Sequence, residues 1–179
     1  DYHVSLLNWL DEMEAKGLNI YGQAFVNRSW NQLRATEFDV WQGTSPSFLA
    51  FTLARTADRM SALAADPAFV AQAAEEYEPM MWMGAGGPLE TFKLVDAREA
   101  SGFTQYNGKL LGEIAAAEDR HVVEIFFAII AGSKAVADFR TTVATSTNPD
   151  MSAEILLHKR VVSGTSDGGA HVKFHCGGQ

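Results

Sequence analysis

A serine, an aspartate and two glycines stand together near the end of the chain, within residues 160–176, RVVSGTSDGGAHVKFHC. Ser166 and Asp167 follow a short apolar run, and Gly168 and Gly169 let the backbone turn with positive φ at little steric cost. A carboxylate at the C-terminal end of a buried strand lies where α/β barrels and open α/β sheets place their catalytic and ligand-binding residues. There it can take up and release a proton during a reaction. The same four residues also suit a polar turn without chemistry, because each type favours turns for local reasons.

Two histidines and the single cysteine come directly after this turn. His171 and His175 are spaced i, i+4, which on a helix places both imidazoles on one face, as in a metal-binding pair. The residues between them, 172–174, are typical of a strand or loop, and this context disfavours the pair. Cys176 needs a neighbouring base and an electropositive site to act as a nucleophile, so we expect a buried structural thiol.

The elements that must position Asp167 are alternating helices and strands. Residues 2–16 carry apolar side chains at helical spacing and end before Gly17, and residues 18–26 then form a candidate buried strand. Further candidate strands cover residues 89–95 and 161–164. Helices between successive strands favour a parallel sheet, so we expect these three strands side by side with Asp167 at their common C-terminal edge. Arg28, which follows the first strand, would lie at the same edge, although a lone arginine is also an ordinary solvated cation.

The remaining segments are predicted mainly as helices. Residues 30–47 have no clear period and are expected to form an active-site loop or short helical turns. Asp66-Pro67 and Asn148-Pro149 each combine an N-cap with a proline that suits a first helical turn. Periodicity predicts helices over residues 47–64, 67–77, 110–115, 122–132 and 149–157, and a short strand within residues 136–144.

Length and composition limit the number of domains, the partners and the location that this protein can have. The 179 residues fit one domain, 1–179, with ample apolar content for a core. A formal net charge of -8 argues against nucleic acid or an anionic membrane surface as a partner. No apolar run approaches the length of a membrane span, and one cysteine allows no intrachain disulfide. A reducing, cytoplasmic location is the simplest expectation.

Three segments, taken in order, resemble one family. They are RMSALAADPAFVAQ, NGKLLGEIAAAEDRHVVEIFFAII and LLHKRVVSGTSDGGAHV. Together they resemble the amidohydrolase superfamily, in its branch of N-acyl-D-amino-acid deacylases (D-aminoacylases). The resemblance implies an α/β fold, namely the C-terminal portion of a (β/α)8 TIM-type barrel, about strands six to eight, with a helical insertion after Val95. Because a complete barrel needs roughly 250 residues, the N-terminal strands would lie outside this chain.

The resemblance also implies a chemistry. Asp167 corresponds to an aspartate of the family's metal centre and would shuttle a proton beside a divalent metal, expected to be zinc. His171, Arg28 and Ser166 would contact or orient a small N-acylated substrate, and the partner protein would be the remainder of the same enzyme or a second copy. A metal lowers the pKa of bound water toward about 7, whereas an aspartate with an ordinary pKa of about 3.9 is a weak base by itself.

The chain departs from the family pattern at the metal ligands. It contains no His-x-His, and residues 21–27 contain no histidine where the family commonly has one. Of the family's metal-centre positions only Asp167 is present, so the other ligands are not in this sequence. Two alternatives therefore stay open. One is a non-catalytic α/β domain that binds a ligand or partner, and the other is an amidohydrolase for a different amide, cyclic amide or ester.

Overall fold

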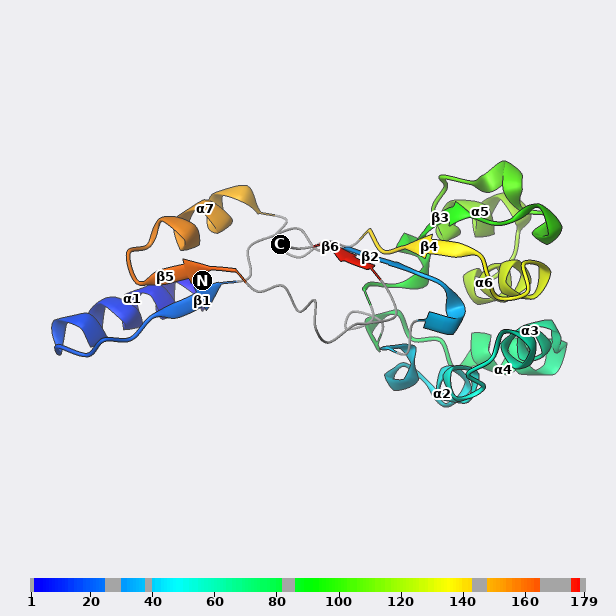
Figure 1. Ribbon diagram of the computed structural model, residues 1–179, viewed down its shortest axis with the longest axis horizontal. Helices are drawn as coiled ribbons and strands as arrows, with labels where there is room; N and C mark the ends of the chain where they lie inside the picture. The colour runs from blue at the N-terminus through cyan, green and yellow to red at the C-terminus, as the bar shows by residue number, and fades with distance from the viewer. Residues whose placement is uncertain are drawn as a thin grey trace. The chain divides into compact units, whose positions relative to one another are not determined.

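The computed structural model describes residues 2–24, 30–37, 40–81, 86–142, 148–164 and 175–177, of which residues 40 and 175–177 are described as backbone only (Figure 1). The chain is a mixed α/β protein that divides into two compact units. Unit 1 contains residues 1–29, 144–170 and 176–179, and unit 2 contains residues 30–143 and 171–175. Among the described residues, no helix has both the length and the apolar character needed to cross a membrane.

Unit 1 is built from two helices and two strands. Helix α1 covers Tyr2–Ala15 and ends before Gly17, whose φ of 77° suits glycine at this position. Strand β1, Gly22–Ala24, pairs in parallel with β5, Val161–Ser163, in the register Gly22↔Val161. Helix α7, Pro149–Leu157, precedes β5. The parallel pairing predicted for the first and last candidate strands is therefore confirmed, over three residues of each strand.

Capping side chains fix where several helices begin. Asn148 Oδ1 accepts hydrogen bonds from the backbone amides of Asp150 and Met151 at the start of α7, both at 3.1 Å. Asp66 Oδ1 accepts one from the amide of Ala68, at 2.9 Å, at the start of α4, Pro67–Glu75. These bonds satisfy amide groups that lack a partner within the first helical turn, and they confirm both predicted helix starts.

Unit 2 packs helices against a four-stranded sheet. The sheet order is β3-β4-β2-β6, and β4 is antiparallel to both β3 and β2. The strands of this sheet are β2, Trp30–Leu33; β3, Lys93–Asp96; β4, Asp138–Arg140; and β6, His175–Gly177, of which His175 alone belongs to unit 2. Besides α4, its α-helices are α2, Pro46–Leu53; α3, Ala57–Ala65; α5, Leu111–Glu118; and α6, Val122–Gly132.

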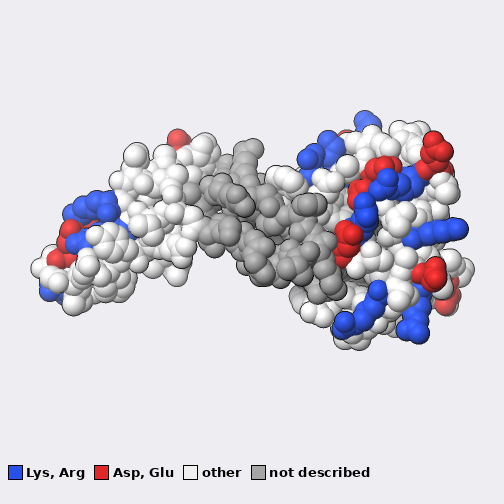
Figure 2. Space-filling model, in the orientation of Figure 1, with Lys and Arg blue, Asp and Glu red and all other residues white. Residues whose placement is uncertain are grey.

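The hydrophobic core of unit 2 is centred on α6. Phe126 and Phe127 are fully buried on this helix, and Trp41 meets Phe126 edge-on with ring centroids 5.1 Å apart. Phe48 stacks on Phe127 at 5.3 Å. Edge-to-face and offset aromatic contacts of this kind add to the stabilisation from burial alone. Charged side chains of both signs are interspersed on the face of unit 2 that Figure 2 shows.

Two predictions about unit 2 are wrong. Residues 89–95 were expected as a third parallel strand, but Leu89–Thr91 is a 3₁₀ turn and β3 pairs antiparallel with β4. Alternating burial suits an antiparallel strand with one covered face, and it does not identify the partner. Residues 47–64 were expected as one helix, yet the chain breaks between α2 and α3. Arg55 has φ of 61° there, and Thr56 caps the second helix.

Two further outcomes concern strands. The strand predicted within residues 136–144 is confirmed as β4. Residues 30–47 contain the predicted short helical turns, Ala35–Glu37 and Val40–Gly43, and also β2, which the pattern did not indicate.

Candidate functional site

The C-terminal ends of β1 and β5 are joined directly before the segment that contains Asp167. The amide of Gly164 donates to the carbonyl of Ala24 at 3.3 Å, and Gln23 Nε2 donates to the carbonyl of Gly164. Gly164 has φ of 118°, a backbone conformation that side-chain-bearing residues rarely adopt. The chain therefore leaves the parallel pair at the edge where α/β proteins place their functional loops.

The start of β5 is held by an arginine that contacts α1 and the segment before β1. Arg160 Nε and Nη2 donate to Glu14 Oε1 at 3.1 and 2.9 Å, and its Nη1 donates to Asn19 Oδ1 at 2.8 Å. Its guanidinium lies 4.9 Å from the centre of the Tyr21 ring. Hydrogen bonds from Lys159 and then Arg160 lower the pKa of the Glu14 carboxyl. The cluster ties the residue before β5 to α1 and to the segment before β1.

The predicted site residues themselves fall mostly outside the described part of the chain. Arg28, Ser166, Asp167 and His171 are among the residues that the structure does not describe, so their predicted roles stay predictions. His175 belongs to strand β6, which is not the helix that a metal-binding i, i+4 pair requires. Cys176 is in the same strand.

The described residues do not supply a metal centre. No three histidine, cysteine, aspartate or glutamate side chains among them lie close enough together to hold a metal ion. His3 and His121 contact residues that do not form a metal-ligand group. His3 Nε2 is 3.0 Å from Glu154 Oε2, and His121 Nδ1 accepts a hydrogen bond from the amide of Val123 at 3.3 Å. Asp167 is not among the described residues, so the ligands of a metal held by it stay a prediction.

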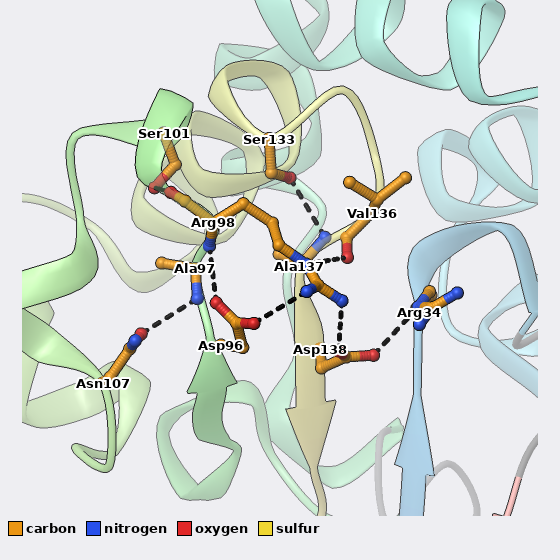
Figure 3. A network of polar contacts seen from close by, with 10 residues as sticks. All are labelled: Arg34, Asp96, Ala97, Arg98, Ser101, Asn107, Ser133, Val136, Ala137 and Asp138. Atoms are coloured by element: carbon orange, nitrogen blue, oxygen red, sulfur yellow. Dashed lines mark hydrogen bonds and ion pairs between the residues drawn. The ribbon is translucent and has the colours of Figure 1, made fainter.

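An extended polar network lies where three strands of unit 2 meet (Figure 3). Asp138, at the start of β4, accepts from Arg34 Nε at 3.0 Å and from Arg98 Nη2 at 2.7 Å, using one oxygen for each. Arg98 also contacts Asp96 Oδ2 through Nη1 at 2.8 Å, and its Nε donates to the carbonyl of Val136 at 3.1 Å. Two aspartates and two arginines thus balance in charge, and each has a defined partner.

The network acts as a clamp between strands. The hydrogen bond that Arg34 donates to Asp138 is the main cause that raises the pKa of Arg34, so this guanidinium stays charged. Arg98 has φ of 65°, which costs backbone energy and is held by the surrounding contacts. Because the charges are already paired, the cluster suits fixing β2, β3 and β4 better than binding an anion. None of these four charged residues was singled out from the sequence, because no spacing rule connects them.

A second polar contact fastens α4 to the turn before β3. Tyr77 accepts from the amide of Leu89 at 2.8 Å and donates to Glu90 Oε2 at 2.6 Å. Burial, and then the hydrogen bond with Glu90, raise the pKa of the Tyr77 hydroxyl far above its ordinary value. Tyr77 therefore remains a neutral hydrogen-bonding group at physiological pH and joins these two segments.

Sequence and structure comparisons identify no relative of this chain. No family model, no curated protein and no solved structure matches it. A functional conclusion therefore rests on the parallel pair β1–β5, on the residues that follow it, and on the resemblance of the three sequence segments.

Proposed function

We propose that the protein is a metal-dependent amide hydrolase resembling N-acyl-D-amino-acid deacylases, with unit 1 forming part of its (β/α)8 barrel. The observation that carries the proposal is the β1–β5 pair. Two neighbouring parallel strands, each preceded by a helix, end together where the segment SDGGAH begins. This is the position at which α/β barrels hold their catalytic residues.

The order of elements also supports an insertion within such a barrel. β1 and β5 are hydrogen-bonded neighbours, yet residues 30–143 of unit 2 lie between them in the sequence. We place the insertion between these two strands, so that it includes β2, β3 and β4. The insertion is therefore larger than the helical segment after Val95 that the resemblance implied.

The proposed reaction is hydrolysis of the amide bond of an N-acylated amino acid. Water adds to the amide carbonyl, the C–N bond breaks, and the products are a carboxylic acid and a free amine. Asp167 takes the proton from the water and passes it to the leaving nitrogen, as a general base and then a general acid. The divalent metal, when bound, lowers the pKa of the water so that a carboxylate can accept its proton at neutral pH. His171, Ser166 and Arg28 would orient the substrate.

The test is carried out on the full-length product of the gene that encodes this chain. Metal content is measured by elemental analysis, and hydrolysis is measured with matched N-acetyl-D- and N-acetyl-L-amino acids. We expect bound divalent metal and preferential hydrolysis of the D-substrates. A metal-free protein that hydrolyses neither series, but binds a small molecule or protein specifically, would instead identify a non-catalytic α/β domain.

A further inference from the structure

The sheet of unit 2 carries its charged side chains in rows that run across β2, β4 and β3. One row of residues in register is buried in the core and consists of Leu33, Phe139 and Leu94. Because side chains alternate along a strand, the residues beside this row point to the opposite face of the sheet. Gln32 pairs with Arg140, and Arg140 pairs with Lys93, so these three residues form one row on that face.

The neighbouring row on the same face shows how like charges are neutralised in this sheet (Figure 3). Asp138 on β4 pairs in register with Asp96 on β3. Like charges directly opposite each other destabilise an antiparallel pair. Arg98 compensates for this with contacts to Asp96 at 2.8 Å and to Asp138 at 2.7 Å, and Arg34 lies 3.0 Å from Asp138. This row therefore contains its own opposite charges.

The Gln32–Arg140–Lys93 row lacks such opposite charges within the described part of the chain. Arg140 and Lys93 lie directly opposite each other, and both side chains are positively charged at neutral pH. The ion pairs formed among the described residues include neither of them. Gln32, on the other side of Arg140, is uncharged. Two cations held in this way cost stability, and an anion bound between them would remove that cost.

An aromatic side chain lies against the arginine of this row. The Arg140 guanidinium is 5.7 Å from the centre of the Trp30 ring, and Trp30 precedes Gln32 by two residues on β2. A guanidinium stacks on aromatic faces, and this contact restricts its orientation. Trp30 is also 39% exposed, so its indole offers apolar surface beside the two cations. A planar guanidinium, an ammonium group and an apolar surface together suit a carboxylate that is attached to an apolar body.

We propose that the Gln32–Arg140–Lys93 row binds the carboxylate of a small organic acid. Arg140 donates two parallel hydrogen bonds to the carboxylate, Lys93 supplies a second positive charge, and the apolar body of the acid lies against Trp30. One arginine and one lysine match a single carboxylate group. An extended acidic peptide fits less well, because the arginines of the neighbouring row are already paired. The inference goes beyond the proposed hydrolysis and does not depend on Asp167.

Titration of the full-length gene product with benzoate, followed by NMR, tests the proposal, and benzamide is the matched neutral probe. We expect benzoate to bind with a dissociation constant of about 1 mM or lower, and benzamide to bind at least about tenfold more weakly. Arg140→Gln should weaken benzoate binding at least about tenfold, and Lys93→Gln should weaken it to a smaller extent. Arg59→Gln, at an exposed position on α3, is the control and should leave binding unchanged.

Thermal melts of the same variants show whether the row exists for binding or for stability. Because each substitution removes one of two opposed like charges, Arg140→Gln and Lys93→Gln should melt no lower than the wild type in the absence of ligand. A melting temperature about 4 °C lower or more for Arg140→Gln would show that a carboxylate of the protein itself compensates the row, and would overturn the proposal.

The binding outcomes decide the proposal independently of the hydrolase. Failure to bind benzoate, equal binding of benzamide, or benzoate binding that survives Arg140→Gln would each overturn it. Benzoate binding that is lost in Arg140→Gln, in a protein that hydrolyses no N-acyl amino acid, would support this inference while refuting the hydrolase.

Discussion

Replacing Asp138 with asparagine should destabilise unit 2 although the side chain keeps its size. The two carboxylate oxygens of Asp138 each accept one bond, from Arg34 Nε at 3.0 Å and from Arg98 Nη2 at 2.7 Å. An amide has one acceptor oxygen, so the NH₂ group of the substituted side chain would face a guanidinium donor. One arginine would lose its bond to residue 138, whose side chain is only 17% exposed in the wild type, although Arg34 keeps Glu37 and Arg98 keeps Asp96 nearby.

The expected magnitude follows from these contacts. A hydrogen bond to a charged group contributes about 1.5–3 kcal/mol, and a donor left without a partner costs about 1–3 kcal/mol when it is buried. The side chains of Arg34 and Arg98 are 41% and 37% exposed, so water partly replaces the lost bond. We therefore expect Asp138→Asn to lower the free energy of unfolding by about 2 kcal/mol.

The assay measures the unfolding of unit 2 in urea, and near-ultraviolet circular dichroism is the signal. Glu37→Gln is the matched control, since it removes the same charge from Arg34 at a longer distance of 3.7 Å and a more exposed position. We expect the control to change the free energy of unfolding by about 0.5 kcal/mol or less. If Asp138→Asn costs no more than Glu37→Gln, the network does not clamp the strands and the reasoning is refuted.

Two further predictions concern unit 2. Burial would raise the pKa of Glu76, but bonds from the Ser47 amide at 2.8 Å and from Gln72 at 2.9 Å outweigh it and lower the pKa. The ionised carboxylate thus stabilises the fold above its ordinary pKa, and this stabilisation is lost as pH falls through the lowered value. Thermal melts between about pH 5 and about pH 3 should therefore show a larger loss for the wild type than for Glu76→Gln, and parallel losses would contradict this. Gly132→Ala should cost about 1–3 kcal/mol in urea unfolding, because its Cβ would lie 2.8 Å from Ser101 Cα, whereas Gly43→Ala, with nothing within 4 Å, should be nearly neutral.

Local chemistry made several elements predictable from the sequence. Asp66-Pro67 and Asn148-Pro149 begin helices because their side chains cap the first amides, and Gly17 follows a helix because its φ is positive. The parallel pairing of β1 with β5 was also predictable, since a helix precedes each strand. The helix starts and the helix end depend on neighbouring residues alone, whereas the β1–β5 pairing follows from the order of helices and strands.

Contacts between residues that are distant in the sequence were not predictable in the same way. The apolar alternation of residues 89–95 indicated a strand, but nothing in it specified β4 as the antiparallel partner. Arg34 and Asp138 are far apart in the sequence, so no spacing rule connects them. The break between α2 and α3 was missed because apolar residues continue through it, while Arg55 adopts a conformation that residue type does not signal. The site residues predicted after β5 lie outside the described residues, and their roles remain predictions.

The most direct test of the central claim is kcat/KM of Asp167→Asn in the full-length protein, measured on an N-acyl-D-amino acid. Asparagine keeps the size of the side chain and suits a polar turn, but it cannot carry the proton. We expect kcat/KM to fall by roughly three orders of magnitude or more, toward the upper end of general acid–base effects, with an unchanged thermal melt and metal content measured in parallel. His171→Asn should cost less, on the order of 10–100-fold, as expected for a residue that orients the site. If Asp167→Asn keeps most of the activity, or loses it only by unfolding, Asp167 is structural and the proposed mechanism is wrong.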